Sequence, residues 1–217
     1  MITELFKHKA VIICGHFGTG KTNIAVNLAL AAADRFTNVC IADLDTVNPY
    51  FRTADNAEEL RRRNVNVLLP QFANTNVDIP SLPPSFPLIF TTDCCSVTDV
   101  GGDEEGAAVL RGFAERYESI GYDMYYVFNA FRPENANTEY SLYSLRAIEA
   151  ASGLKFSGII NNSNLGAETD RSVVFSAQEK AQEFANESGV PLVMTTAFEK
   201  NAFPGCTVIE DVTKKLF

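Results

Sequence analysis

A strand-like run followed by a glycine-rich octapeptide constrains this chain more than any other feature. Residues 10 to 14 read AVIIC and residues 15 to 22 read GHFGTGKT, which leads into an apolar helical segment at 21 to 35. The octapeptide matches the pattern G-x-x-x-x-G-K-[ST], in which glycines let successive backbone N–H groups point at phosphate oxygens. In this pattern Lys21 reaches the β- and γ-phosphates and Thr22 binds Mg²⁺. The predicted phosphate-binding loop comprises Gly15, His16, Phe17, Gly18, Thr19, Gly20, Lys21 and Thr22.

Strand-like and helical segments alternate along the rest of the chain. Apolar runs lie at 38–45, 65–70, 94–102, 123–131, 154–164 and 190–196, and helical segments at 54–63, 104–120, 137–152 and 168–188. Such alternation is typical of βαβ units, which build a parallel sheet with helices on both faces. The sequence therefore predicts an α/β fold of the P-loop NTPase kind, in a single domain over residues 1–217. The stretch 70–87, rich in Asn and Pro, is expected to be a long surface loop.

Carboxylates stand at the carboxyl ends of two strands beside the expected loop. The run 38–45 ends at Asp45, and the run 94–102 carries Asp99 shortly before Gly102. A nucleotide hydrolase needs a carboxylate that holds hydrated Mg²⁺ and a group that places the attacking water. We assign the metal to Asp99 together with Thr22, and the water to Asp45. Gly102 is expected to offer a backbone N–H to the γ-phosphate, and Lys21, Asp45 and Asp99 are the expected catalytic residues.

Composition disfavours several other functions. The formal net charge of −9 means that an anionic polymer would meet a repulsive mean field, so nucleic acid is not an expected partner. The five cysteines include no C-x-x-C pair, which argues against a zinc site, an iron–sulfur cluster or a disulfide framework. No run approaches the roughly 20 apolar residues of a membrane span. The first residues lack the arrangement of a signal peptide, and the expected compartment is the cytoplasm.

Taken together, these motifs resemble those of the MinD/ParA/CobQ-type P-loop ATPases, a branch of the SIMIBI class that also includes the signal-recognition GTPases. The resemblance covers most of the chain and rests on GHFGTGKT, IADLDTVNPYF, TDVGGD and IINN. It implies ATP and Mg²⁺ as cofactors, a role for Asp45 in positioning water and metal, and an adenine contact by Asn161 or Asn162. The phrases NPYFR, FANTNVD and DVGGDEEGA resemble a subgroup described only as ATP-binding or ParA-like.

One position departs from that family. Many members carry a lysine directly after the first glycine of the loop, and this lysine crosses a dimer interface to the partner's nucleotide. Here the position is His16, which is shorter and at most partly charged at neutral pH. The sequence therefore leaves a homodimer open. Arg52 and Arg132 follow strands, and each is a candidate either for an arginine finger or acidic-substrate contact, or for a salt bridge.

The leading functional hypothesis is a slow, Mg²⁺-dependent ATPase that acts as a switch, with residues 45–55 and 99–106 moving between nucleotide states. A GTPase is disfavoured because no N-K-x-D guanine-reading motif occurs. One alternative is an ATP-dependent kinase or ligase of the dethiobiotin-synthetase or cobyrinate type, whose acceptor would contact loop 70–87 and Arg52. Another is a nucleotide sensor without turnover. The partner is thus either an unidentified protein or a small-molecule acceptor.

The end of the chain, residues 208–217, is short and amphipathic. Its apolar residues are expected to close the core, because so short a helix with two lysines binds bilayers poorly. Membrane attachment is therefore not expected.

Overall fold

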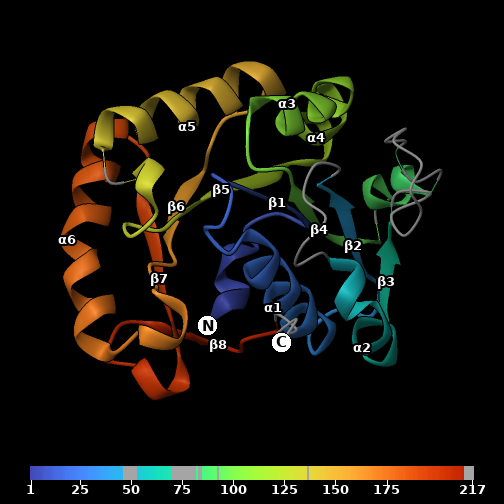
Figure 1. Cartoon of the computed structure of the whole chain (residues 1–217). Helices are drawn as coiled ribbons and strands as arrows, with labels where there is room; N and C mark the ends of the chain where they lie inside the picture. The colour runs from blue at the N-terminus through green and yellow to red at the C-terminus, as the bar shows by residue number, and fades with distance from the viewer. Residues whose placement is uncertain (46–52, 70–81, 83–84, 92, 136, 213–217) are drawn as a thin grey trace, which may run out of the picture.

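The computed structural model describes residues 1–45, 53–69, 82, 85–91, 93–135 and 137–212 (Figure 1). Their strands form an eight-stranded parallel sheet in the order β3-β2-β4-β1-β5-β6-β7-β8. The strands are β1 (Ala10–Cys14), β2 (Val39–Leu44), β3 (Val65–Leu68), β4 (Cys95–Val100), β5 (Tyr122–Phe128), β6 (Gly158–Asn161), β7 (Leu192–Phe198) and β8 (Thr207–Ile209). The α-helices are α1 (Lys21–Ala33), α2 (Ala57–Arg62), α3 (Glu104–Ala108), α4 (Ala114–Ile120), α5 (Thr138–Ser152) and α6 (Arg171–Ser188). The predicted parallel α/β fold is confirmed.

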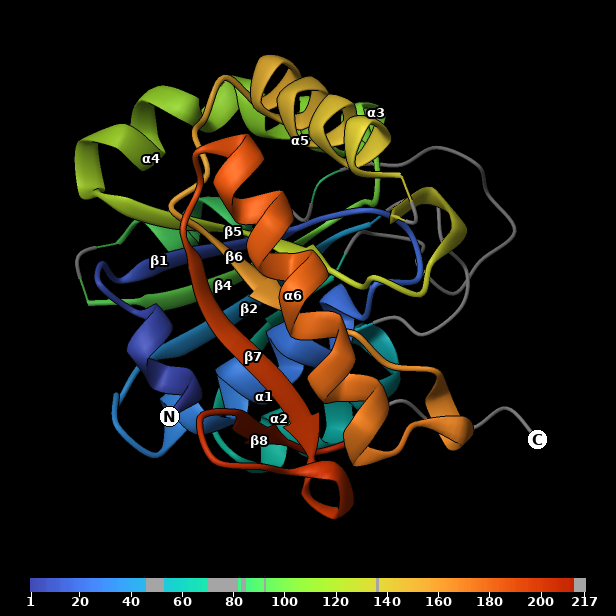
Figure 2. The same cartoon turned by 90° about the vertical axis from the view of Figure 1, so that its left-hand side faces the viewer.

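Helices cover both faces of the sheet, as Figure 2 shows with α3, α4 and α5 on one side and α1 and α2 on the other. Strand β1 lies between β4 and β5 and is buried along its whole length. Its side chains alternate: Ile12 and Cys14 pack with α3 to α6, whereas Val11 and Ile13 pack with α1 and α2. A strand buried on both faces reads as a continuous apolar run, which is why AVIIC has no polar position. Among the described residues, none of the helices combines the length and the apolar character needed to cross a bilayer.

The sequence predicted one helix over 104–120, but the structure divides it. Helix α3 ends at Ala108, the 3₁₀ helix η4 runs over Val109–Phe113, and α4 begins at Ala114. Gly112 lies in the 3₁₀ turn, where its lack of a Cβ weakens a continuous α-helix.

The expected surface loop 70–87 also ends earlier than predicted. Residues 70–81, 83 and 84 lie outside the described residues, but Phe86 begins the 3₁₀ helix η3 (Phe86–Phe90) and is buried.

The described end of the chain is a strand and an extended segment where a helix was expected. Strand β8 pairs with β7, and the residues after it lie along α1. The side chains of Asn23 and Asn27 both donate to the backbone O of Glu210, at 3.0 and 2.9 Å. In return, the backbone N–H groups of Glu210 and Val212 donate to those two asparagines. Ile209 is buried in the core, as expected for the apolar residues here, whereas Val208 is exposed and residues 213–217 lie outside the described residues.

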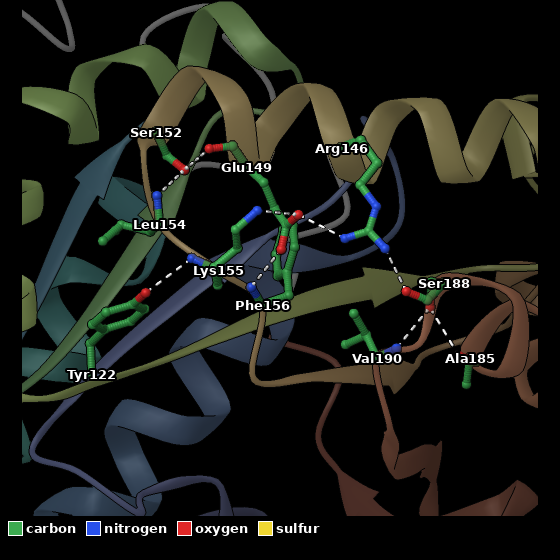
Figure 3. Close-up of polar contacts among 10 residues, drawn as sticks. All are labelled: Tyr122, Arg146, Glu149, Ser152, Leu154, Lys155, Phe156, Ala185, Ser188 and Val190. Atoms are coloured by element: carbon green, nitrogen blue, oxygen red, sulfur yellow. Dashed lines mark hydrogen bonds and ion pairs between the residues drawn. The ribbon is translucent and has the colours of Figure 1, made fainter.

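A buried carboxylate joins three elements on the α5 side of the sheet (Figure 3). Glu149 of α5 is 4% exposed, and its Oε2 accepts from Arg146 at 2.8 Å and from Lys155 at 3.1 Å. Its Oε1 accepts from the backbone N–H of Phe156, and Arg146 also donates to the backbone O of Ser188 at the end of α6. Burial alone would raise the pKa of Glu149, but these hydrogen bonds and the Lys155 charge hold it below its ordinary value.

Replacing Glu149 with alanine is expected to destabilise the protein by about 1.5–3 kcal/mol, because hydrogen bonds to a charged group are lost and the N–H of Phe156 is left without its acceptor. Urea unfolding at pH 7 measures the effect. Since the folded pKa of Glu149 is lowered, the difference between wild type and variant should shrink as the pH falls through that value. Glu179→Ala, at an exposed position of α6, is the control and should change stability by less than about 0.5 kcal/mol. Equal losses in both variants would contradict the assignment.

Candidate nucleotide-binding site

The octapeptide forms a tight loop between the end of β1 and the start of α1. Gly15 has φ +135°, and a Cβ at this position would lie 2.5 Å from the backbone O of Val127 in β5. Only glycine fits there, because the loop passes directly over the neighbouring strand. Thr19 donates its hydroxyl to the backbone O of His16 at 2.8 Å, which closes the turn. The loop therefore has the strand–loop–helix context that its motif predicts.

Lys21 and Thr22, the first residues of α1, face the carboxyl edge of the sheet. The Lys21 side chain is 5% exposed, and its Nζ donates to the backbone O of His16 at 3.3 Å. The Thr22 hydroxyl donates to Oδ2 of Asp99, the fifth residue of β4, at 2.7 Å. The structure thus brings together the loop lysine, the loop threonine and the strand-end carboxylate, which lie nearly 80 positions apart along the chain.

Asp99 is a buried carboxylate, and one of its two oxygens accepts no hydrogen bond from the described residues. It is 1% exposed, and its Oδ2 accepts from the hydroxyls of Thr22 and Thr53, the latter at 3.2 Å. Its Oδ1 is buried and has no hydrogen-bond partner among the described residues. Burial raises the pKa of Asp99 from 3.8 to about 6, against the opposing effects of the Lys21 charge and the Thr22 hydrogen bond, while the charge of Asp45 adds to the increase. A buried carboxylate oxygen without a donor, beside a threonine hydroxyl, fits the oxygen ligands that Mg²⁺ prefers.

The segment after β4 lies directly against the phosphate loop. A Cβ at Gly102 would lie 2.7 Å from the backbone N of Phe17 and 3.2 Å from Lys21 Nζ. Glycine is required here because two backbone segments and an ammonium group converge. A Cβ at Gly101 would lie 3.6 Å from Oδ1 of Asp45, which places that carboxylate on the same side. Gly102 therefore lies beside Lys21, and Asp45 lies beside Gly101 and on the same cavity wall as Lys21.

A cavity of about 410 Å³ opens beside the loop. Predicted residues on its wall are Phe17, Gly18, Gly20, Lys21, Thr22, Asp45 and Asn162, together with Arg132. Five further lining residues were not expected from the sequence: Asn23, Asn164, Gly166, Phe198 and Asp211. The far wall is thus built by the loops after β6 and β7 and by the segment that lies along α1. No motif marks these residues, because they come from α1, from the segment after β6, from the end of β7 and from the last described segment, and only the fold assembles them.

The two asparagines assigned to the base have different surroundings. Asn161 is fully buried, its Oδ1 accepts from Ser163, and it is absent from the cavity wall. Asn162 lines the cavity, donates from Nδ2 to the backbone O of Thr19 at 2.8 Å and accepts from the Thr196 hydroxyl at 2.7 Å. Asn162 therefore ties the phosphate loop to β7 as well as facing the cavity.

His16 and Arg132 flank the outer side of the loop. The His16 ring meets Tyr140 of α5 edge-on, with ring centroids 6.1 Å apart, and its Nδ1 is 3.9 Å from Oε2 of Glu134. Arg132 donates from Nε to the backbone O of Gly18 at 2.6 Å. Arg132 is thus a second cation on the cavity wall. The other arginine considered, Arg52, lies outside the described residues.

Comparison with known proteins agrees with this architecture. No protein-family model matches the sequence, and no curated protein matches it. Among solved structures, the chain is similar to the cell division protein FtsY from Thermotoga maritima, with a TM-score of 0.59 and 19% identity over 92% of this chain and 69% of that chain. It is also similar to the signal recognition particle receptor FtsY from Elizabethkingia anophelis, with a TM-score of 0.53 and 15% identity over 96% of this chain and 66% of that chain. The chain therefore has the α/β fold of P-loop NTPases.

Proposed function

We propose that the protein binds ATP with Mg²⁺ and hydrolyses it slowly, so that the bound nucleotide acts as a switch. The observation that carries the proposal is the 2.7 Å contact between the hydroxyl of Thr22 and the carboxylate of Asp99. It joins the end of the phosphate loop to the end of β4. The Oδ1 of Asp99 is buried and has no hydrogen-bond partner among the described residues, which supports the proposal that a cation binds here.

The roles of the remaining residues follow from their positions. The backbone N–H groups of the loop and the Lys21 ammonium bind the β- and γ-phosphates, and the start of α1 adds its favourable dipole. Thr22 and Asp99 hold Mg²⁺, with Asp45 beside them. Bound Mg²⁺ neutralises phosphate charge. Asp45 places the attacking water, and the N–H of Gly102 binds the γ-phosphate.

The base is proposed to lie in the far part of the cavity. Asn162 is the better candidate of the two asparagines for an adenine contact, since it lines the cavity and Asn161 does not. Its Nδ2 and Oδ1 each use one hydrogen bond inside the protein, and each can make a second. Phe198 offers an aromatic surface on the same wall.

Direct competition between nucleotides tests the proposal. Calorimetry with ATP and with GTP, each with Mg²⁺, should show ATP binding at least 10-fold more tightly. Removal of the metal with a chelator should weaken ATP binding, and phosphate release in the presence of Mg²⁺ should be slow but above the rate without protein. Equal affinities for the two nucleotides would overturn the adenine assignment, and binding of neither would overturn the proposed function.

A further inference from the structure

Two buried cysteines lie in contact at the other end of the strands that carry Asp45 and Asp99. Cys40 is the second residue of β2, and Cys94 directly precedes β4. Cys40 is 3% exposed and Cys94 is 2% exposed, and their two Sγ atoms are 2.7 Å apart. Nonbonded heavy atoms pack best at about 3.5–4.0 Å, and a disulfide bond is about 2.05 Å long. The sulfurs therefore need to move by less than 1 Å to become bonded.

One of the two thiols, that of Cys40, lines a cavity. A hollow of about 680 Å³ lies between the β3 edge of the sheet and η3, away from the nucleotide site, and Cys40 lines it while Cys94 does not. Leu68 and Leu88 form apolar parts of the wall, and Asn38, Arg61, Asn64 and Asn66 form polar parts. A small polar molecule that enters this hollow meets the Cys40 sulfur first.

The hydrogen bond between the thiols gives them different reactivities. The Cys94 S–H donates to Cys40, which lowers the pKa of Cys40, with a smaller contribution from Asn66 and against the effect of burial. The same hydrogen bond, together with burial, raises the pKa of Cys94. Burial raises the pKa of Cys95 to about 12 and also raises that of Cys14. The thiolate is the reactive form, so Cys40 is the most nucleophilic member of this group.

We propose that Cys40 and Cys94 form a redox-active dithiol that a low-molecular-weight disulfide oxidises to an intramolecular disulfide. The Cys40 thiolate attacks one sulfur of the small disulfide, forms a mixed disulfide and releases one thiolate. Cys94 then loses its proton to that thiolate or to solvent and attacks the Cys40 sulfur, releasing the second small thiol. Two protein thiols are oxidised and one small disulfide is reduced to two thiols, so atoms and electrons balance.

The new bond would join β2 to the start of β4 and close the chain between residues 40 and 94. This closure restricts the unfolded chain and stabilises the folded state. We expect the melting temperature of the oxidised protein to rise by about 5–10 °C, with reversal by dithiothreitol.

The test uses the full chain with Cys206→Ser, which removes a half-buried thiol outside the pair. The protein is treated with glutathione disulfide, unfolded in guanidinium chloride so that the buried thiols become accessible, alkylated with N-ethylmaleimide and weighed intact. Two of its four thiols should escape alkylation, and peptide mapping should find residues 40 and 94 linked. Cys95→Ser, next in sequence to Cys94, is the matched control and should still form the bond.

Single variants of the pair distinguish its two members. Cys94→Ser should stop at the mixed disulfide, with one glutathione attached to Cys40, whereas Cys40→Ser should gain neither an adduct nor a bond. If Cys94→Ser does not fold, Cys94→Ala is used in its place and should give the same mixed disulfide. Alkylation of all four thiols after oxidant treatment would overturn the proposal. So would loss of the bond in Cys95→Ser, or a glutathione adduct found on Cys94 in place of Cys40.

Discussion

Replacing Lys21 with alanine is expected to abolish MgATP binding, with a loss of affinity of about 100-fold or more. The Lys21 ammonium is buried on the cavity wall, next to the loop backbone and to the position of Gly102. Hydrogen bonds between an ammonium and phosphate are charge-assisted, at about 1.5–3 kcal/mol each, and two or more of them would be lost. Isothermal titration calorimetry with MgATP measures the loss directly.

Two further variants control this experiment. Lys180→Ala, at an exposed position of α6, should bind MgATP within about twofold of the wild type. Lys21→Met keeps the length and apolar part of the side chain without its charge, so it separates loss of charge from loss of packing. If Lys21→Ala binds MgATP with unchanged affinity, the phosphate-loop assignment is wrong.

Replacing Asp99 with asparagine is expected to abolish Mg²⁺-dependent turnover while making the metal-free protein more stable. Asparagine keeps the shape of the side chain and one acceptor oxygen for Thr22, but it has no charge for the metal. Loss of a metal carboxylate removes several kcal/mol of charge stabilisation, which lowers the rate of phosphate release by about 100-fold or more. Because the pKa of Asp99 is raised from 3.8 to about 6, its ionised form costs the metal-free fold about 3 kcal/mol at pH 7.

The pH dependence of this gain has a definite sign. Between pH 4 and pH 6 the folded protein binds more protons at Asp99 than the unfolded chain, so wild-type stability falls as the pH rises through this window. The stability of the Asp99→Asn variant does not decrease in this way, because asparagine does not titrate. Urea unfolding without metal should therefore show a gain for the variant at pH 7 that disappears near pH 4. Asp93→Asn, at an exposed position before β4, should show neither effect, and a destabilised Asp99→Asn at pH 7 would contradict the account.

Local patterns predicted the parallel sheet and the strand–loop–helix arrangement of β1, the octapeptide and α1. The loop motif fixes its own geometry. Asp99 alone is as consistent with a helix cap or a surface position, and it becomes a candidate because Asp45 also stands at the end of a strand beside the loop. Thr53 was missed although its hydroxyl donates to Asp99, because it lies in a 3₁₀ helix with no periodicity. Phe198 and Asp211 were missed because their place on the cavity wall depends on how β7 and the last segment fold back.

The distinction between Asn161 and Asn162 also needed the fold. Asn161 is the last residue of β6 and Asn162 follows it, so the direction of each side chain depends on how the strand ends. The sequence motif IINN does not say which of the two faces the cavity. The cavity wall includes Asn162 and not Asn161, and hydrogen bonds to Thr19 and Thr196 hold Asn162 there.

The hydrogen bonds between α1 and the segment at Glu210 and Val212 have a consequence for the order of folding. Asn23 and Asn27 exchange these hydrogen bonds with backbone groups more than 180 positions away along the chain. Strand β1 likewise needs β4 and β5 on its two sides. Contacts of such large sequence separation form slowly, so the loop between β1 and α1 reaches its final geometry only after distant parts of the chain have come together.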